Sequence, residues 1–195
     1  DDGHSPLLTG SFQQMQGQTE RMQHLVDDLL LLTRLETQQK KSQCVDIPAL
    51  LSQICKEGDT LENASRRIEL SLETAVHIVG DEQELRSAFT NLLGNALKYS
   101  PEDSLVKVRW YQDKESIVLA IEDQGEGIAK ADIPKVTERF YRVETKRLKK
   151  VNGTGLGLAI VKHVLMRHDA HLNIISELGK GSCFSCHFPV GRLCH

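Results

Sequence analysis

Apolar residues recur at helical spacing through the first part of the chain. Between residues 12 and 36 they are three, four or seven positions apart, and Gln, Glu, Arg and Asp fill the gaps. This spacing predicts one long helix whose narrow apolar stripe packs against a partner helix. Packing on the rest of this chain is the alternative. The stripe consists of Phe12, Met15, Met22, Leu25, Val26, Leu29 and Leu32.

The long helix is bordered by segments without this periodicity. Residues 1–6 are expected to be a loop, with Ser5-Pro6 as the helix start. Residues 37–43 are polar and are expected to form a linker. We therefore predict a boundary near residue 41, with a helical part over residues 1–40 and a second domain over residues 41–195.

Helical and strand patterns alternate in the second domain. Strand 76–79 is expected to pair with strand 68–72, whose apolar residues alternate with polar ones. A short helical piece is expected near residues 133–140. This order predicts an α/β sandwich, in which helices cover one face of a mixed sheet. Helices are expected over about 48–61, 81–100 and 156–167, and strands over 45–47, 68–72, 76–79, 106–110, 117–121, 172–176 and 182–188.

Charge and hydropathy narrow the range of partners. The net charge of −3 argues against nucleic acid as the main partner, because phosphate backbones require a basic face. No apolar run approaches the roughly 18 residues that span a bilayer. Any membrane attachment of the protein is therefore expected to lie outside this sequence.

The five cysteines are odd in number and scattered, which is unlike a disulfide framework. We expect core cysteines in a reducing compartment. The segment 183–187 matches the Cys-x-x-Cys-His spacing of haem attachment, but it lies in a predicted strand. Cys183 and Cys186 would then point to opposite faces of that strand, which favours core packing over haem. Whether Cys183, Cys186 and His187 have a role beyond packing stays open.

The first candidate motif lies on the predicted helix 81–100. Asn91, Asn95 and Lys98 fall on one stripe, because offsets of four and seven return to the same helix face. Amide oxygens suit Mg²⁺, and an ammonium group suits phosphate. A solvated polar face is the alternative interpretation. The opposite face carries the core residues Leu85, Phe89, Leu92 and Ala96.

The second motif, residues 123–128, directly follows an apolar strand. Its glycines permit a close backbone approach to a flat ligand or a positive φ. The carboxylate of Asp123 can accept a hydrogen bond from an exocyclic amine such as that of adenine. An ordinary tight turn is the alternative.

The third motif, residues 153–158, opens a predicted helix with the spacing G-x-G-x-G. Free N–H groups and the positive dipole end at a helix N-terminus suit phosphate. The motif differs from the dinucleotide-binding fingerprint, because a basic loop precedes it rather than a strand, and the chain contains no G-x-x-x-x-G-K-[ST] loop.

The fourth motif, residues 137–142, lies between the two glycine motifs. Its aromatic residues are candidates to anchor a mobile lid. The cations that follow would meet phosphates, or would simply be solvated. These cations are Lys146, Arg147, Lys149 and Lys150.

Taken in their order along the chain, residues 91–99, 123–128, 137–142 and 153–158 resemble the N, G1, F and G2 boxes of the ATP-binding domain of sensor histidine kinases. That domain belongs to the superfamily shared with gyrase B, the Hsp90 chaperones and MutL. The resemblance covers about residues 45–190, and residues 22–36 resemble the second helix of the family's dimerisation and phosphotransfer hairpin. It implies a Bergerat-type ATP-binding fold, preceded by a long helix from a truncated hairpin.

The resemblance also implies Mg-ATP as the ligand and assigns roles to residues. Asn95 would coordinate Mg²⁺ with support from Asn91, while Lys98 would meet phosphate. Tyr99 would line the adenine side, and Asp123 would accept from the adenine amino group. Tyr141 and Arg142 would contact the nucleotide from the lid edge. The remaining binding residues are Gly125, Gly127 and Ile128 at the adenine wall, and Gly153, Thr154, Gly155, Leu156, Gly157 and Leu158 around the phosphates.

One position separates kinases from hydrolases within this superfamily. Its ATP hydrolases carry a water-activating glutamate at the position of Asn91. An amide cannot act as a general base, so transfer to a protein nucleophile fits better than hydrolysis. A nucleotide-dependent interaction module without chemistry, and an ATPase of the chaperone or gyrase kind, are the alternatives.

The family's phosphoacceptor histidine has no match in this chain. His4 is followed by Ser-Pro-Leu, without the acidic residue that the family places after its histidine, so the role is not carried over to it. We therefore expect a truncated fragment that does not autophosphorylate alone. The resemblance implies that the full-length protein is a homodimer and an inner-membrane sensor, of which this is a cytoplasmic portion. Its γ-phosphoryl group would pass to the histidine and then to an aspartate of a response regulator.

Overall fold

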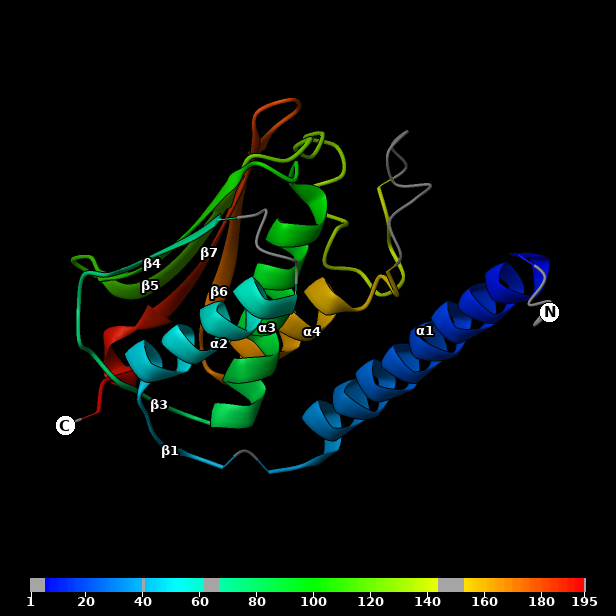
Figure 1. The fold of residues 1–195 in the computed structure, drawn as a ribbon. Helices are drawn as coiled ribbons and strands as arrows, with labels where there is room; N and C mark the ends of the chain where they lie inside the picture. The colour runs from blue at the N-terminus through cyan, green and yellow to red at the C-terminus, as the bar shows by residue number, and fades with distance from the viewer. Residues whose placement is uncertain (1–5, 40, 62–66, 144–152, 195) are drawn as a thin grey trace.

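The computed structural model describes residues 6–39, 41–61, 67–143 and 153–194 (Figure 1). A long helix precedes an α/β sandwich. The helices are α1 (Pro6–Thr37), α2 (Ile47–Leu61), α3 (Glu82–Tyr99) and α4 (Gly157–Arg167), with a 3-10 turn at Val190–Arg192. The strands are β1 (Gln43–Val45), β2 (Arg67–Leu72), β3 (Ile78–Gly80), β4 (Leu105–Gln112), β5 (Ser116–Asp123), β6 (His171–Glu177) and β7 (Gly181–Pro189).

The main sheet is mixed, as the alternation of elements predicted. Its five strands lie in the order β2-β4-β5-β7-β6, with β2 and β4 parallel and the other neighbours antiparallel. Helices α2, α3 and α4 lie on one face of this sheet (Figure 1). The predicted fold class is therefore confirmed.

The core lies between the sheet and the helices. Val106, Val108 and Trp110 alternate along β4 and are at most 1% exposed. Leu85, Phe89 and Leu92 on α3 are 0% exposed, and Ala96 is also buried. Each such side chain contributes about 1.5–3 kcal/mol by leaving water. Because this face of α3 is buried, the stripe that carries Asn91, Asn95 and Lys98 turns away from the core.

Helix α3 begins and ends where its sequence predicts. The carboxylate of Asp81 accepts from the backbone N–H groups of Gln83 (3.0 Å) and Glu84 (3.2 Å), an N-cap that satisfies two otherwise unpaired donors. The backbone N–H of Asp81 donates to Nε2 of the buried His168 (3.0 Å). Ser100 is extended because Pro101 follows it.

Three local predictions are wrong. Strand β3 pairs with β1 in a separate two-stranded sheet, not with β2, which pairs with β4 instead. The first strand ends at Val45, because Asp46 accepts from the backbone N–H of Ala49 (2.9 Å) and α2 begins at Ile47. Residues 133–140 form turns rather than a helix.

The structure contains one disulfide, which the scattered cysteines did not indicate. Cys44 on β1 and Cys194 near the C-terminus form a disulfide, with their Cα atoms 5.8 Å apart. They are 150 positions apart in the sequence, so no local pattern reveals the pairing. Cys55, Cys183 and Cys186 are free, and in β7 Cys186 faces the core while Cys183 lies on the opposite, half-buried face, as the strand pattern predicted.

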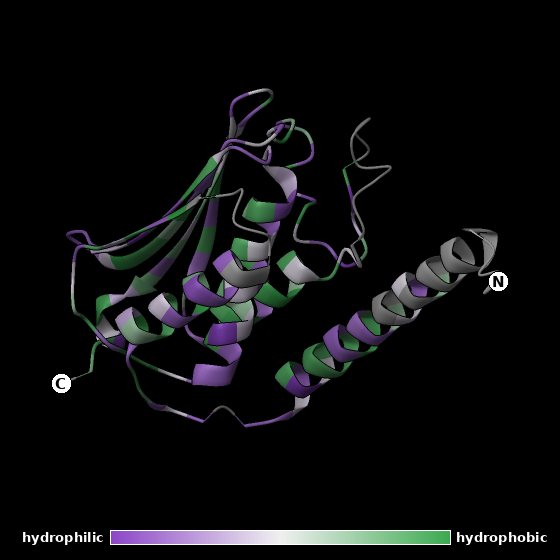
Figure 2. Cartoon of the chain, in the orientation of Figure 1, coloured by the Kyte–Doolittle hydropathy of each residue, from purple (hydrophilic) through white to green (hydrophobic). Residues whose placement is uncertain are grey.

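Helix α1 packs on the sandwich by its last turns only. Leu32 and Leu35 are buried there, whereas Met15, Met22 and Val26 are more than half exposed. The rest of the helix projects away from the sandwich (Figure 2). The C-terminal end of the stripe therefore packs on this chain, whereas Met15, Met22 and Val26 remain largely exposed.

The guanidinium group of Arg167 joins three helices at this junction. Its Nε and Nη2 atoms donate to the carboxylate of Glu84 on α3 at 2.8–3.1 Å. Its Nη1 atom donates to the carbonyls of Leu35 (2.8 Å) and Gln38 (3.1 Å) at the end of α1. Both charged side chains are at most 20% exposed, so the pair is shielded from solvent.

Replacing Arg167 by alanine tests this junction. We expect a loss of about 2 kcal/mol in the free energy of unfolding, because a largely buried carboxylate and two helix-terminal carbonyls lose their donor. Urea denaturation measures the loss. The matched control is Arg86→Ala, which breaks an exposed pair with Glu57 (3.3 Å) and should cost well under about 1 kcal/mol. Equal losses in the two variants would contradict the assignment.

Candidate functional site

Four segments far apart in the sequence meet where α3 ends, β5 ends and α4 begins. Helix α3 carries the polar stripe, and the turn after β5 carries Asp123 and its glycines. The loop before α4 carries the G-x-G-x-G motif, and residues 137–142 lie against that loop. Helices α3 and α4 pack on each other, which brings the first and third motifs together.

The glycines before α4 lie directly against the polar stripe of α3. A β-carbon on Gly153 would lie 2.7 Å from Nζ of Lys98 and 4.0 Å from the Tyr99 hydroxyl. A β-carbon on Gly157 would lie 2.5 Å from Oδ1 of Asn91. Any side chain at these positions would displace the amide or the ammonium group, so glycine keeps the two motifs in contact.

The side chains of the stripe are oriented by their own helix. Asn91, Asn95 and Lys98 are half-buried. The side-chain nitrogen of Asn91 donates to the carbonyl of Ser87 (2.9 Å), which turns Oδ1 toward Gly157. The ammonium group of Lys98 lies 5.5 Å from the centroid of the Tyr99 ring. The amide oxygen of Asn91 and the ammonium group of Lys98 therefore face the glycine loop. Asn95 is assigned to the same side only by its position on the helix stripe.

Asp123 is a buried carboxylate at the end of β5, only 6% exposed. Its Oδ1 atom accepts from the backbone N–H groups of Gly125 (2.8 Å) and Ser182 (3.3 Å). Burial raises the pKa of this carboxyl group, and the two donors oppose that rise. Both bonds end on Oδ1, so Oδ2 is the atom that can accept from a ligand. Burial disfavours the charged form of this acid, and acids whose pKa is perturbed by burial cluster at functional sites.

The turn after Asp123 requires its glycines. A β-carbon on Gly125 would lie 2.6 Å from the carbonyl oxygen of Tyr99. Gly127 has a φ of +71°, and a β-carbon there would collide with the carbonyl of Glu177. The backbone N–H of Ile128 donates to the Ser176 hydroxyl (2.7 Å). The turn therefore packs between the end of α3 and the hairpin that joins β6 to β7.

The fourth motif reaches the site through its backbone and through Arg142. The N–H of Phe140, which has a φ of 65°, donates to the carbonyl of Gly155 (2.9 Å). Nη1 of Arg142 donates to the carbonyl of Gly153 (3.2 Å). Burial raises the pKa of the Tyr99 hydroxyl, and the charge of Arg142 opposes this rise, so the cation lies near that ring.

The hydroxyl of Tyr141 points elsewhere. It donates to Oδ1 of Asp132 (2.7 Å), and this hydrogen bond raises the pKa of the tyrosine. The predicted contact of Tyr141 with a nucleotide therefore requires either this bond to break or the ring alone to make the contact. Asp132 was not identified from the sequence, because a lone acid in a turn carries no pattern.

Helix α1 contributes contacts that the sequence did not reveal. The hydroxyl of Thr154 donates to Oδ2 of Asp28 (2.9 Å), and burial raises the pKa of the Asp28 carboxyl group. Arg139 pairs with Glu36 near the end of α1. The apolar stripe predicted a packing face on α1, but it did not predict which charged residues of α1 contact the glycine loop.

Some predicted residues lie outside the described ranges. These are His4 and the lid cations Lys146, Arg147, Lys149 and Lys150. Within the described ranges, no group of three or more His, Cys, Asp or Glu residues is placed to hold a metal ion. A magnesium ion bound through one amide oxygen and ligand phosphates needs no such group. No helix of the described residues is long and apolar enough to cross a membrane.

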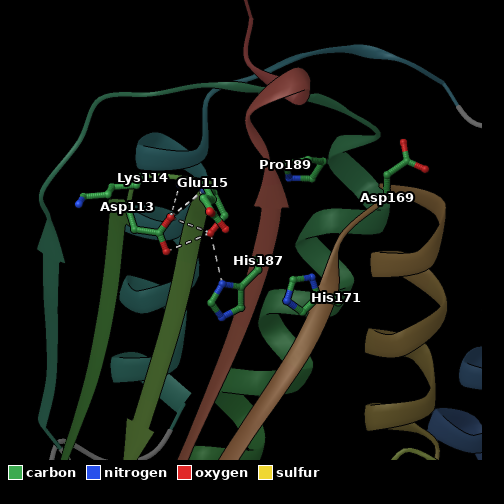
Figure 3. A pocket seen from close by; sticks show the side chains of 8 residues that line it. Asp113, Lys114, Glu115, Asp169, His171, His187 and Pro189 are labelled. Atoms are coloured by element: carbon green, nitrogen blue, oxygen red, sulfur yellow. Dashed lines mark hydrogen bonds between the residues drawn. The ribbon is translucent and has the colours of Figure 1, made fainter.

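A pocket of about 580 Å³ lies at the other end of β5 (Figure 3). His171 and His187 face each other there from β6 and β7, with their rings stacked 4.9 Å apart. The His187 ring lies 3.3 Å from the Ser116 hydroxyl and 3.1 Å from that of Ser185. This pocket lacks a glycine cradle and lies a full strand length from Asp123, so the glycine-lined region is the better candidate site.

Comparison with known proteins agrees with this grouping of the four motifs. The model of the family described as "Histidine kinase-, DNA gyrase B-, and HSP90-like ATPase" matches residues 80–192. These residues contain all four motifs.

Individual relatives are sensor kinases. The "Phosphate regulon sensor protein PhoR" of Pseudomonas aeruginosa is 46% identical over 192 residues, which is 97% of this chain and 43% of that protein. Residues 22–36, 136–143 and 153–165 by themselves predict a likeness to PhoR within the family, and this relative confirms it. The chain spans less than half the length of the PhoR proteins that it matches.

Two solved structures share the fold. The "Mycobacterial sensor histidine kinase MprB" is 30% identical with a TM-score of 0.68, covering 76% of this chain and 97% of that one. ShkA, solved in complex with AMPPNP, is 24% identical with a TM-score of 0.78, covering 95% of this chain and 39% of that one. At this identity ShkA shows the fold alone.

The buried carboxylate predicts a particular effect of pH on stability. Because the pKa of Asp123 is raised in the folded state, its ionised form costs stability at neutral pH, and this cost disappears as the pH falls below the carboxyl pKa of the unfolded chain, about 3.9. Asp123→Asn removes the cost and keeps the Oδ1 acceptor. We expect the variant to be as stable as the wild type at pH 7, or about 1 kcal/mol more stable, with the difference shrinking toward pH 4.

Urea denaturation at pH 7 and pH 4 measures this effect. Glu122→Gln is the matched control, because Glu122 is the exposed neighbour of Asp123 and should leave stability unchanged at both values. A loss of more than about 2 kcal/mol in Asp123→Asn at pH 7 would show that the carboxylate is structural.

Proposed function

Because this chain belongs to the family of histidine kinase-, DNA gyrase B- and HSP90-like ATPases, we propose that its glycine-lined site binds Mg-ATP for phosphoryl transfer in a two-component sensor histidine kinase. Residues 41–195 are the ATP-binding domain in this proposal. Residues 1–40 are part of the dimerisation and phosphotransfer hairpin. Phosphate sensing is the proposed physiological setting, since PhoR of Pseudomonas aeruginosa is 46% identical.

The approach of Gly153 and Gly157 to Lys98 and Asn91 is the observation that carries this proposal. It joins backbone amides at the start of α4 to a cation and an amide oxygen on α3. N–H groups at a helix start and an ammonium group together suit a chain of phosphates. Asp123 lies apart from this cluster, at the end of β5, where a buried acceptor suits an exocyclic amine.

Each group has one role in the bound state. Oδ2 of Asp123 accepts from the adenine amino group, and the backbone of Gly125, Gly127 and Ile128 forms the wall beside the ring. Asn95 supplies an oxygen to Mg²⁺, which keeps several waters and takes phosphate oxygens as well. Lys98 and Arg142 bring positive charge to the phosphates. Mg²⁺ itself supplies charge neutralisation at the transferring phosphoryl group.

Asn91 favours transfer over hydrolysis. Its side-chain nitrogen is engaged with the carbonyl of Ser87, and its oxygen faces Gly157. A side-chain amide is not basic enough to deprotonate water, so Asn91 cannot serve as the general base for hydrolysis of bound ATP. The acceptor in the full-length protein is a histidine, whose imidazole attacks the γ-phosphoryl group. An aspartate of a response regulator then receives the phosphoryl group.

The surroundings of this domain follow from the same proposal. The exposed residues Met15, Met22, Val26 and Leu29 on α1 suit a second copy of the hairpin, so the full-length protein is a homodimer. The described chain is the cytoplasmic portion of an inner-membrane sensor, whose membrane segments lie elsewhere in the protein. No nucleic acid takes part.

A nucleotide-dependent interaction module is the second candidate function. The hydrogen bond between Thr154 and Asp28 favours it, because this bond connects the glycine loop directly to α1 (2.9 Å). ATP that closed the loop would then change the position of α1 without any chemistry. Binding alone does not separate the two functions, but transfer of the phosphoryl group does.

Calorimetric titration with a non-hydrolysable ATP analogue, with and without Mg²⁺, tests the site. We expect micromolar binding by the wild type, about 100-fold weakened in Asp123→Asn, because a charged hydrogen bond in a buried pocket is lost. Asn95→Ala should remove only the part of the affinity that depends on Mg²⁺. The matched controls are Glu122→Gln and Asn173→Ala, which change exposed residues of β5 and β6. Unchanged affinity in both site variants would overturn the assignment.

Phosphoryl transfer is tested by supplying the missing acceptor. The chain is incubated with γ-labelled ATP and a separate hairpin of Pseudomonas aeruginosa PhoR that carries its histidine. We expect acid-labile label on the hairpin, none on the same hairpin with alanine in place of histidine, and only background release of phosphate without it. Nucleotide binding without label transfer would favour the interaction module. Rapid hydrolysis without a hairpin would favour an ATPase.

A further inference from the structure

The disulfide between Cys44 and Cys194 joins the two ends of the sandwich. Cys44 lies in β1 opposite Val79 of β3. The backbone N–H of Cys194 donates to the carbonyl of His77 (3.1 Å), and Leu193 forms a bridge with Ile78. Both cysteines are therefore held by the backbone beside the same short strand. Their Cα separation of 5.8 Å lies within the range that disulfides bridge, so the backbone already brings the two residues together.

This pair is accessible, whereas two of the free thiols are not. The side chain of Cys44 is exposed, and that of Cys194 is half-buried. Cys55 and Cys186 are buried, and burial raises the pKa of the Cys55 thiol to about 11. Because the thiolate is the reactive form, those thiols are slow to react, while an exposed disulfide exchanges with small thiols.

The crosslink anchors the segment that leads from α1 into the sandwich. At the α1 end, Arg167 holds the carbonyls of Leu35 and Gln38. At the other end, β1 has only three residues paired with β3. With the disulfide closed, the chain from Gln38 to Cys44 is fixed at both ends. With the disulfide open, the second anchor is reduced to the short β1–β3 ladder.

We propose that Cys44 and Cys194 form a reversible redox clasp that controls how firmly β1, where the linker from α1 ends, is held beside β3. A low-molecular-weight disulfide such as glutathione disulfide closes the clasp, and a thiol such as glutathione opens it. Thiol exchange at this pair does not depend on the proposed nucleotide binding. Reversible disulfides of this kind sense redox state where the surroundings are reducing.

Closure proceeds by two thiol–disulfide exchanges. The thiolate of Cys44 attacks one sulfur of glutathione disulfide, which forms a mixed disulfide and releases one glutathione. The thiolate of Cys194 then attacks the Cys44 sulfur, which forms the protein disulfide and releases the second glutathione. The two protein thiols lose two electrons and two protons, which the two glutathione molecules carry away as thiols. Opening is the reverse of these steps.

Equilibration in glutathione buffers of graded composition tests the clasp. The protein is quenched with acid, unfolded, alkylated and mapped by mass spectrometry. We expect a Cys44–Cys194 crosslink and alkylation of Cys55, Cys183 and Cys186 in oxidising buffer, and alkylation of all five cysteines in reducing buffer. Cys44→Ser and Cys194→Ser should abolish the transition, and Cys183→Ser should leave it unchanged. Alkylation of all five cysteines at every ratio, or a crosslink to Cys183, would overturn the proposal.

Hydrogen exchange of the wild type with and without a phosphine reductant tests the effect on the linker. We expect the amides of residues 43–45 to exchange at least about 10-fold faster after reduction, and Tm to fall by about 5–10 °C, since a very long loop is released. The reductant should change neither quantity in Cys44→Ser. If that variant fails to fold, the comparison of oxidised and reduced wild type still tests the proposal. Identical exchange and Tm in oxidised and reduced wild type would refute the clasp.

Discussion

The burial of one face of α3 is the constraint on which the rest of the structure depends. Leu85, Phe89 and Leu92 lose all contact with solvent against the sheet, and this apolar burial is worth several kcal/mol in total. A rotation of α3 that exposed them would be far more costly than any gain from its polar residues. The packing therefore determines that Asn91 and Lys98 face the loop before α4, where the proposed nucleotide site lies.

The second requirement is the close approach of glycines to neighbouring elements, which at Gly125 and Gly127 leaves no room for a β-carbon beside the facing backbone. At Gly153 and Gly157 a β-carbon would displace the groups that the α3 stripe presents, and at Gly125 it would collide with the end of α3. The glycines thus link three elements into one cradle. Asp123 lies buried beside Gly125, and its pKa, raised by burial, fits the ligand-binding role that we propose for this carboxylate.

Contacts of α1 join this site to the rest of the molecule. Arg167 fastens the end of α1 to α3 and α4, and Asp28 binds the hydroxyl of Thr154 in the glycine loop. The disulfide of Cys44 then fixes the chain that follows the linker. A movement of α1 would therefore strain a hydrogen bond of the proposed site, whereas the disulfide acts on the chain after the linker, at β1.

The sequence predicts features that depend on the residue spacing within a single element. The spacing of Leu85, Phe89, Asn91 and Lys98 predicted both faces of α3, since residues three or four apart share a face whatever lies opposite. The order of the four motifs likewise indicated the family. Prediction failed for contacts between segments that are distant in the sequence: β3 pairs with β1, Cys44 with Cys194, and Thr154 with Asp28. Local periodicity states which face of a segment is apolar, but it does not state which partner will cover that face. Those pairings depend on how the packed helices and sheet bring distant residues together, and so only the tertiary structure decided them.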